Sequence, residues 1–147
     1  MMFTWKPPNS PAIVQVILIV SDQADISEMW EASFQEKGFT TVCEAPENAP
    51  QTCRLIDPAI TVVDTQFPHT KRLEFCLELR AATPSPIILL VPDYNGNQMI
   101  DIYNIGVDEC LLKPISSAFL VVKATSWLLR RRWLDFDSNL KHAYTGI

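Results

Sequence analysis

Apolar residues in this chain gather into short runs, which alternate with segments where they recur every three or four positions. The runs are four to seven residues long. Continuous apolar runs of this length are typical of parallel strands that are buried on both faces of a sheet. The predicted strands occupy residues 14–20, 39–43, 60–64, 86–91 and 109–112.

The segments between these runs have the spacing of amphipathic helices. Gly38 and Gly106 follow two of them, where helices commonly end, and Ser116 precedes the last one as a capping residue. The predicted helices occupy residues 26–37, 48–55, 71–82, 99–105 and 116–132, and a loop that contains His69 is expected over residues 65–70. Strands that alternate with helices predict an α/β protein with a small doubly wound parallel sheet.

The length of 147 residues is that of one domain. We expect this domain to span residues 13–132. Residues 1–12 are rich in proline and are expected to form an N-terminal extension. Residues 133–147 are polar and are expected to form a tail or a truncated linker.

Charge, hydropathy and cysteine content argue against several classes of function. The net charge of −5 argues against binding nucleic acid by bulk electrostatic attraction. No apolar stretch is long enough to span a membrane. The cysteines lack CxxC spacing, so we expect free thiols in the reducing cytoplasm rather than a zinc site. They are Cys43, Cys53, Cys76 and Cys110.

Charged side chains stand at the ends of three predicted strands. Asp22 follows the first, Asp64 ends the third, and Lys113 follows the fifth. In an open α/β sheet, ligands bind beyond the carboxyl ends of the strands. Two carboxylates there can hold a hard divalent cation, a carboxylate can attack a phosphoryl donor, and an ammonium can neutralise the transferred group. An aspartate after a strand is also a common turn or capping residue, and this simpler interpretation stays open for Asp64 alone.

Lys113 is followed by Pro114, which disfavours helical geometry at the lysine and can follow a cis peptide bond. Such a bond would direct Lys113 back over the site. The alternative is a plain strand-to-helix turn with a solvated lysine.

Four segments together resemble the receiver domains of two-component response regulators. They are VILIVSDQ, ITVVDTQFP, PSPIILLVP and GVDECLLKPIS, in the order and spacing of that family, and they lie within residues 14–132. The resemblance implies a flavodoxin-like doubly wound fold, with five parallel strands in the order 2-1-3-4-5 and five helices. It also implies a signalling module that is no enzyme beyond catalysing its own phosphorylation and dephosphorylation.

The same resemblance assigns roles to the charged residues. Asp64 corresponds to the phosphoacceptor, which takes a phosphoryl group from a sensor histidine kinase. Asp22, Asp64 and the backbone carbonyl of Gln66 correspond to the ligands of Mg²⁺, and Lys113 to the lysine of the site.

Three positions depart from the family pattern. Ser21 replaces the first of two acids, Val91 replaces a serine or threonine at the end of the fourth strand, and Cys110 replaces the aromatic switch residue of the fifth. We therefore expect weak Mg²⁺ binding and an atypical receiver, because the usual hydroxyl-to-aromatic relay lacks both of its members. A valine cannot donate a hydrogen bond to a phosphoryl oxygen.

The last predicted helix resembles the end of receivers that precede a winged-helix DNA-binding domain, which would lie outside this chain. We expect a homodimer through the face formed by the fourth helix, the fifth strand and the fifth helix, because the last helix has more apolar residues than one buried stripe needs. Its apolar residues are Phe119, Leu120, Val122, Trp127 and Leu128, and the charges that could rim the interface are Asp108, Glu109, Lys123 and Arg130.

One other function stays open, and two functions of the enzyme class fit the sequence poorly. The main alternative is a pseudo-receiver, a protein-interaction module that works without phosphorylation. A flavodoxin-like cofactor binder would need a phosphate-binding loop where the chain has acidic residues after the first strand, and a haloacid-type phosphatase would need an aspartate at Gln66. Trp30 and Trp127, at apolar helical positions, are expected to pack in the core or at an interface.

Overall fold

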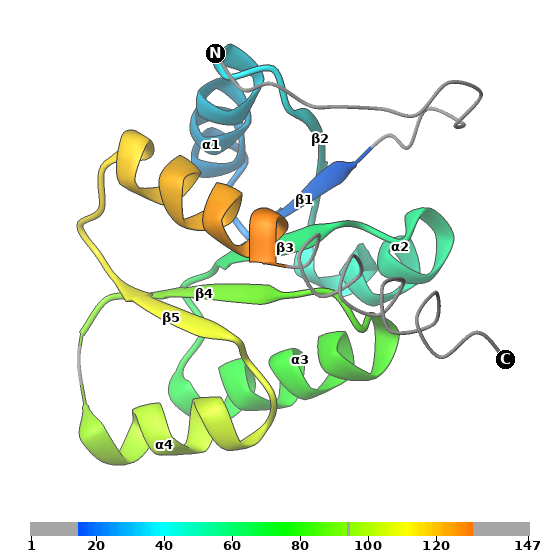
Figure 1. Ribbon diagram of the computed structural model, residues 1–147. Helices are drawn as coiled ribbons and strands as arrows, with labels where there is room; N and C mark the ends of the chain where they lie inside the picture. The colour runs from blue at the N-terminus through cyan, green and yellow to red at the C-terminus, as the bar shows by residue number, and fades with distance from the viewer. Residues whose placement is uncertain (1–14, 94, 131–147) are drawn as a thin grey trace, which may run out of the picture.

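A parallel sheet of five strands forms the centre of the protein (Figure 1), and the computed structural model describes residues 15–93 and 95–130. The strand order is β2-β1-β3-β4-β5, which confirms the flavodoxin-like doubly wound fold. The strands are β1 (Val16–Ser21), β2 (Thr40–Glu44), β3 (Ile60–Asp64), β4 (Ile87–Val91) and β5 (Glu109–Leu112).

Five helices connect and follow these strands, as predicted. The fifth, called the last helix below, is described over residues 117–130. Ser116 caps it, because its Oγ accepts the N–H of Phe119 at 3.1 Å. The others are α1 (Ala24–Glu36), α2 (Ala49–Ile56), α3 (His69–Ala82) and α4 (Gly96–Asn104), with a short 3₁₀ turn, Pro46–Asn48, before α2.

The helices cover both faces of the sheet (Figure 1). On one face, Ile17 and Ile19 of β1 pack with Trp30 of α1 and with the last helix. On the other face, Leu18 and Val20 pack with α2, α3 and α4. Because successive side chains of each strand enter opposite cores, both must be apolar, which explains the continuous apolar runs. Asp64 ends β3, whose Ile60 and Val62 belong to the first of these cores.

Helices α1, α3 and α4 begin two or three residues before their predicted starts, and the starts of α3 and α4 alter the expected loops. His69 lies in the first turn of α3 rather than in a loop, and its Nε2 lies 3.2 Å from Oδ2 of Asp101 in α4. Helix α4 begins at Gly96 because the side chain of Asn95 accepts the N–H groups of Asn97 and Gln98. The loops before both helices are therefore shorter than expected.

Arg80 of α3 fixes the strands at the amino ends of β4 and β5. Its guanidinium donates to Oδ2 of Asp108 at 2.9 Å and to the carbonyl of Gly106 at 2.8 Å. Gly106 has φ +102, and a Cβ there would lie 2.7 Å from Cδ of Arg80. Only glycine therefore fits this turn without a shift of the arginine.

Among the described residues, no helix has the length and apolar character required to cross a membrane.

Candidate functional site

The carboxyl ends of β1, β3 and β5 bring the expected site residues to one edge of the sheet. Ser21 is the register partner of Asp64 on the neighbouring strand. The backbone N–H of Lys113 donates to the carbonyl of Val91 at 2.8 Å, so the residue after β5 lies beside the end of β4. The Lys113–Pro114 peptide bond is cis.

Asp64 is held from two sides. Its side chain is only 3% exposed. Oδ1 lies 2.7 Å from Nζ of Lys113, and Oδ2 accepts a hydrogen bond of 2.9 Å from the indole N–H of Trp30. A charged donor and a neutral donor therefore each occupy one oxygen of the same buried carboxylate, which satisfies the hydrogen-bonding requirement that burial imposes.

Asp22 ties the loop after β1 to the loop after β3. Its two carboxylate oxygens lie 3.3 and 3.2 Å from the backbone nitrogen of Gln66, which donates to them. This bond places Asp22 beside Gln66, the residue whose carbonyl is the expected third metal ligand. Ser21 adds no charge, and its Oγ accepts the N–H of Gln23 at 3.1 Å.

The donor set fits a magnesium ion in number and type. Mg²⁺ usually takes one or two carboxylates, keeps several waters and prefers oxygen ligands. Asp22 and Asp64 supply two carboxylates and Gln66 a carbonyl. Within residues 15–93 and 95–130, no group of three or more His, Cys, Asp or Glu side chains is arranged to hold a metal ion. Two carboxylates and one carbonyl would leave the other positions of an octahedral cation to water.

The two atypical switch positions lie next to this edge. Val91 is buried and has no hydroxyl group to offer. Cys110 is half-buried, and its backbone N–H donates to the hydroxyl of Tyr103 in α4 at 3.0 Å. Burial raises the pKa of the Cys110 thiol to about 11, so the thiol is neutral at physiological pH. The hydroxyl of Tyr103 in α4 thus contacts β5 at Cys110, the atypical switch position.

Sequence reasoning missed the contact between Trp30 and Asp64. The prediction for Trp30 was packing, which its burial supports, but a buried indole N–H also needs an acceptor. This need for an acceptor was the signal that the sequence offered for the contact, because the apolar positions of α1 face the same core as the end of β3. Nothing in the sequence indicated which acceptor Trp30 would use.

Arg72 of α3 is a second residue without a sequence signal. It is buried, and its Nη2 donates to the carbonyl of Phe67 at 3.0 Å. In the part of the chain that the structure describes, its Nε has no hydrogen-bond partner, and neither has the buried Oγ1 of Thr65. The guanidinium lowers the pKa of the Cys110 thiol, against the larger effect of burial, which raises it.

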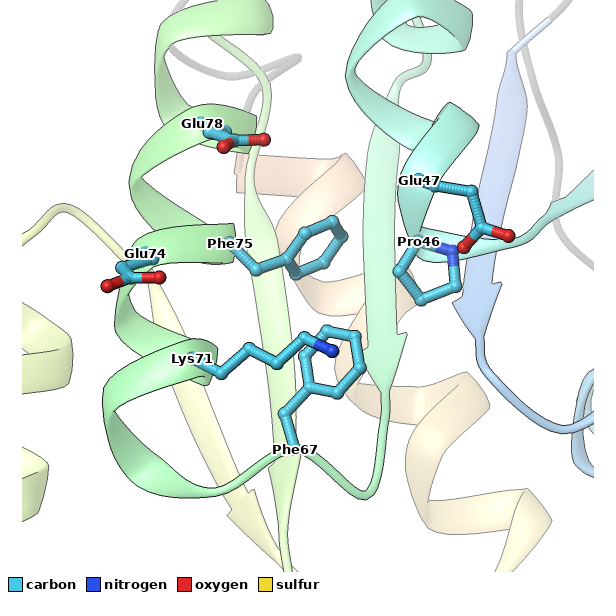
Figure 2. Close-up of a pocket in the computed structure, with 7 residues that line it drawn as sticks. All are labelled: Pro46, Glu47, Phe67, Lys71, Glu74, Phe75 and Glu78. Atoms are coloured by element: carbon cyan, nitrogen blue, oxygen red, sulfur yellow. The ribbon is translucent and has the colours of Figure 1, made fainter.

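Two cavities flank the loops of the site. One, of about 540 Å³, begins at Ser21 and Asp22 and runs between α1 and β2, and it is lined by Glu28, Glu31, Glu44 and Glu47 among others. The other, of about 220 Å³, lies between α3 and the 3₁₀ turn (Figure 2), where Nζ of Lys71 is 4.2 Å from the centre of the Phe67 ring. The first cavity is therefore acidic, and Asp64 lines neither of the two.

The face expected to dimerise has a different composition from the one predicted. Leu120 and Leu128 are core residues, whereas Phe119 and Val122 are exposed. Three exposed residues not included in the prediction are Ile100 and Tyr103 of α4 and Leu112 of β5.

The charges expected to rim this face are paired inside the chain. Asp108 bonds Arg80, and Glu109 bonds Nζ of Lys123 at 2.8 Å. The indole N–H of Trp127 donates to the other oxygen of Glu109 at 2.6 Å, and Arg130 stacks 4.4 Å from the centre of the Trp127 ring. In the single chain these charges therefore already have partners, and their role at an interface between two copies stays a prediction.

Known proteins share both the sequence pattern and the fold. The transcriptional regulatory protein SphR of alkaline phosphatase synthesis, from Synechococcus elongatus, is 30% identical over 152 residues, covering 96% of this chain and 58% of SphR. The DNA-binding response regulator MtrA of Mycobacterium tuberculosis is 27% identical over 117 residues, covering 79% of this chain and 51% of MtrA. The chain thus spans about half the length of the curated relatives it matches.

Solved structures show the same fold. A CheY-like receiver domain protein from Methanospirillum hungatei has a TM-score of 0.73 at 17% identity, over 82% of this chain and 98% of that one. The activated receiver domain of RstA from Klebsiella pneumoniae has a TM-score of 0.69 at 21% identity, over 78% and 98%. The family model of the response regulator receiver domain matches residues 17–125, which include every residue of the site described above. This chain belongs to the response regulator receiver domains of two-component systems.

Proposed function

We propose that this receiver accepts a phosphoryl group on Asp64 from a sensor histidine kinase. One observation carries the proposal: the Asp64 carboxylate ends β3 at the carboxyl edge of the sheet, with Nζ of Lys113 2.7 Å away. A fixed ammonium at that distance can neutralise charge on the phosphoryl oxygens as the group is transferred. Membership of the receiver family supports the assignment of Asp64 as the nucleophile.

Mg²⁺ would be held by Asp22, Asp64 and the carbonyl of Gln66. When bound, it would neutralise part of the negative charge of the phosphoryl group. The remaining steps belong to the chain: Asp64 supplies the attacking oxygen, Lys113 contacts the transferred group, and the bond between Asp22 and Gln66 holds the two loops together.

The missing hydroxyl makes the transfer slow. In the best-studied sites, loss of one donor that stabilises the transition state costs about 10²–10³ in rate. Val91 leaves this receiver without such a donor at the end of β4. We therefore expect phosphorylation over hours with a small donor, where a receiver with a hydroxyl would react faster.

Intact-mass spectrometry tests this function. The protein is incubated with acetyl phosphate and Mg²⁺, and we expect the mass gain of one phosphoryl group in the wild type and none in Asp64→Asn. Asp93→Asn is the matched control, because it removes an exposed aspartate just after β4. If the wild type gains no mass over many hours, the phosphoacceptor assignment is wrong, and the protein functions as a phosphorylation-independent interaction module.

We also propose a homodimer through the face of α4, β5 and the last helix. Its exposed apolar residues are Ile100, Tyr103, Leu112, Phe119 and Val122. Because Val91 and Cys110 replace the usual switch pair, association should depend little on phosphorylation. Sedimentation velocity with and without acetyl phosphate tests both parts: a monomer at high concentration would remove the interface, and a shift caused by acetyl phosphate would show that another relay exists.

The output and location are further parts of the proposal. MtrA is named a DNA-binding response regulator, and this chain matches about half of it. That name supports a DNA-binding domain outside the present chain as the output. Free cysteines at Cys43, Cys53, Cys76 and Cys110 suit the reducing cytoplasm.

A further inference from the structure

The indole of Trp30 contacts the reacting group of the proposed function, at Oδ2 of Asp64. We propose that Trp30 is a positioning residue that holds one oxygen of Asp64 and leaves the oxygen beside Lys113 as the nucleophile. This inference rests on the proposed phosphoryl transfer and specifies which atom of Asp64 performs it.

Trp30 is placed rigidly enough for this role. Its side chain is 3% exposed and packs in the core between α1, the sheet and the last helix. Phe34, one turn further along α1, is fully buried in the same core. An indole confined in this way cannot swing freely, so its N–H keeps a fixed direction toward Oδ2 of Asp64 at 2.9 Å.

The two oxygens of Asp64 consequently differ. Oδ2 faces the indole of Trp30, which packs in the core. Oδ1 faces Lys113, whose side chain is 26% exposed and therefore marks the solvent side of the carboxylate. A phosphoryl donor can reach the site only from solvent, so it meets Oδ1 first and finds the ammonium already there.

The transfer step balances with this assignment. A lone pair of Oδ1 forms the new O–P bond while the bond from phosphorus to the leaving group breaks. The leaving group takes that electron pair: acetate does so when acetyl phosphate is the donor, and a ring nitrogen, which then takes a proton, does so when the donor is a phosphohistidine. Oδ2 becomes the carbonyl oxygen of the acyl phosphate, and it can still accept the N–H of Trp30.

A purely structural role makes a different prediction. If Trp30 only fills the core, its replacement by phenylalanine lowers stability and leaves the rate of the folded protein unchanged. If Trp30 positions the carboxylate, the maximal rate falls because Oδ1 is less often directed at phosphorus. A full misplacement of a reacting group costs roughly a hundredfold, and loss of one of two holding bonds should cost about tenfold.

The chain contains a matched control for this experiment. Trp127 also donates its indole N–H to a carboxylate that is bonded to a lysine, that of Glu109. Phosphorylation rates are measured by intact mass across a series of acetyl phosphate concentrations for wild type, Trp30→Phe and Trp127→Phe. We expect Trp30→Phe to lower the maximal rate about tenfold with the half-saturating concentration unchanged, and Trp127→Phe to match wild type. A Trp30→Phe protein as fast as wild type, or faster, overturns the positioning role.

Indole resonances provide a second readout that needs no variant of Trp30. In ¹H–¹⁵N spectra of wild type, we expect the Trp30 indole signal to move upfield on phosphorylation, because a neutral carbonyl is a weaker acceptor than a carboxylate. The Trp127 signal should stay in place. A Trp30 signal that is the same in wild type and Asp64→Asn shows that the bond is absent and ends the proposal.

The two proposals fail in different ways. A wild type that never gains a phosphoryl group contradicts the proposed function, and the positioning role falls with it. A wild type that is phosphorylated, with Trp30→Phe equally fast, removes only the role of Trp30.

Discussion

Two carboxylates in this receiver are each held by one tryptophan and one lysine, in two different settings. Trp30 and Lys113 hold the two oxygens of Asp64, and Trp127 and Lys123 hold the two oxygens of Glu109. The indole-to-carboxylate distances are 2.9 and 2.6 Å, and the lysine distances are 2.7 and 2.8 Å. By the lengths of their bonds alone, the two clusters are equivalent.

Their surroundings separate them. Asp64 is 3% exposed and ends a central strand, whereas Glu109 is 19% exposed and lies on the edge strand β5. Electrostatic interactions strengthen where water is excluded, and an exposed ion pair contributes only about 0.2–1 kcal/mol. The comparison teaches that position at the carboxyl edge, and the burial that comes with it, turns a common set of contacts into a candidate reaction centre.

The largest expected difference is in the rate of phosphorylation when each lysine is removed. Lys113→Ala should lower the rate with acetyl phosphate about 10²–10³-fold, because it removes the ammonium beside the attacking oxygen. Lys123→Ala removes the equivalent contact from Glu109 and should leave the rate within about twofold. Initial rates from intact-mass spectrometry measure both. Equal losses in the two variants would show that the ammonium next to Asp64 has no special role in transfer.

The next difference should appear in the coupling of each indole to its acid. A double-mutant cycle with Trp30→Phe and Asp64→Asn should give about 2 kcal/mol of coupling in the free energy of unfolding, as expected for a buried hydrogen bond to a charged group. The cycle with Trp127→Phe and Glu109→Gln should give about 0.5 kcal/mol, because solvent replaces the lost partner. Urea denaturation of the seven proteins, with wild type shared by both cycles, provides the values. Similar coupling in both cycles would mean that burial does not distinguish the clusters.

The sequence predicted the fold well because the fold depends on repeated patterns. The strands at 60–64 and 109–112 have the predicted limits, and the other strands differ by one or two residues. Apolar runs, helical spacing and helix-ending glycines are local signals that many residues share. The start of α4 was missed by three residues because one side chain, that of Asn95, fixes it.

The site was predictable only where it lies at strand ends. Asp64 and Lys113 meet because parallel strands end at one edge, a rule that needs no knowledge of side-chain packing. Trp30 was not predictable as a site residue, since its contact with Asp64 spans 34 residues and depends on how α1 lies over the sheet. The burial of Arg72 and the intrachain ion pairs of Asp108 and Glu109 were equally unpredictable, because a sequence pattern does not show which group a charged side chain will contact.

A smaller effect is expected from restoring the missing acid beside Asp64. Ser21 is buried and is the register partner of Asp64, so Ser21→Asp places a second carboxylate at the same edge. Without metal the two carboxylates repel and the protein should lose stability; with Mg²⁺ the added charge should tighten binding about tenfold. Titration of Mg²⁺ followed by NMR measures the affinity, with Ser21→Asn as the uncharged control. An unchanged affinity in Ser21→Asp would place the cation elsewhere.

The smallest effect concerns Cys110, which lies on β5 next to Glu109 and two residues after Asp108. Burial raises the pKa of its thiol from 9.0 to about 11. An unfolded chain therefore releases this proton near pH 9 while the folded chain retains it until about pH 11, so the stability from this group is complete below pH 9 and is lost as the pH rises toward 11. The unfolding free energy of wild type should fall between pH 8 and pH 10, and we expect a smaller fall in Cys110→Ser. The difference should be about 1 kcal/mol or less, because Cys110 is only half-buried. Urea denaturation of both proteins at these two pH values measures the change. A fall of equal size in the two proteins would show that folding does not protect the thiol. The stabilities of the two clusters would then have to be compared well below pH 9, where Cys110 keeps its proton.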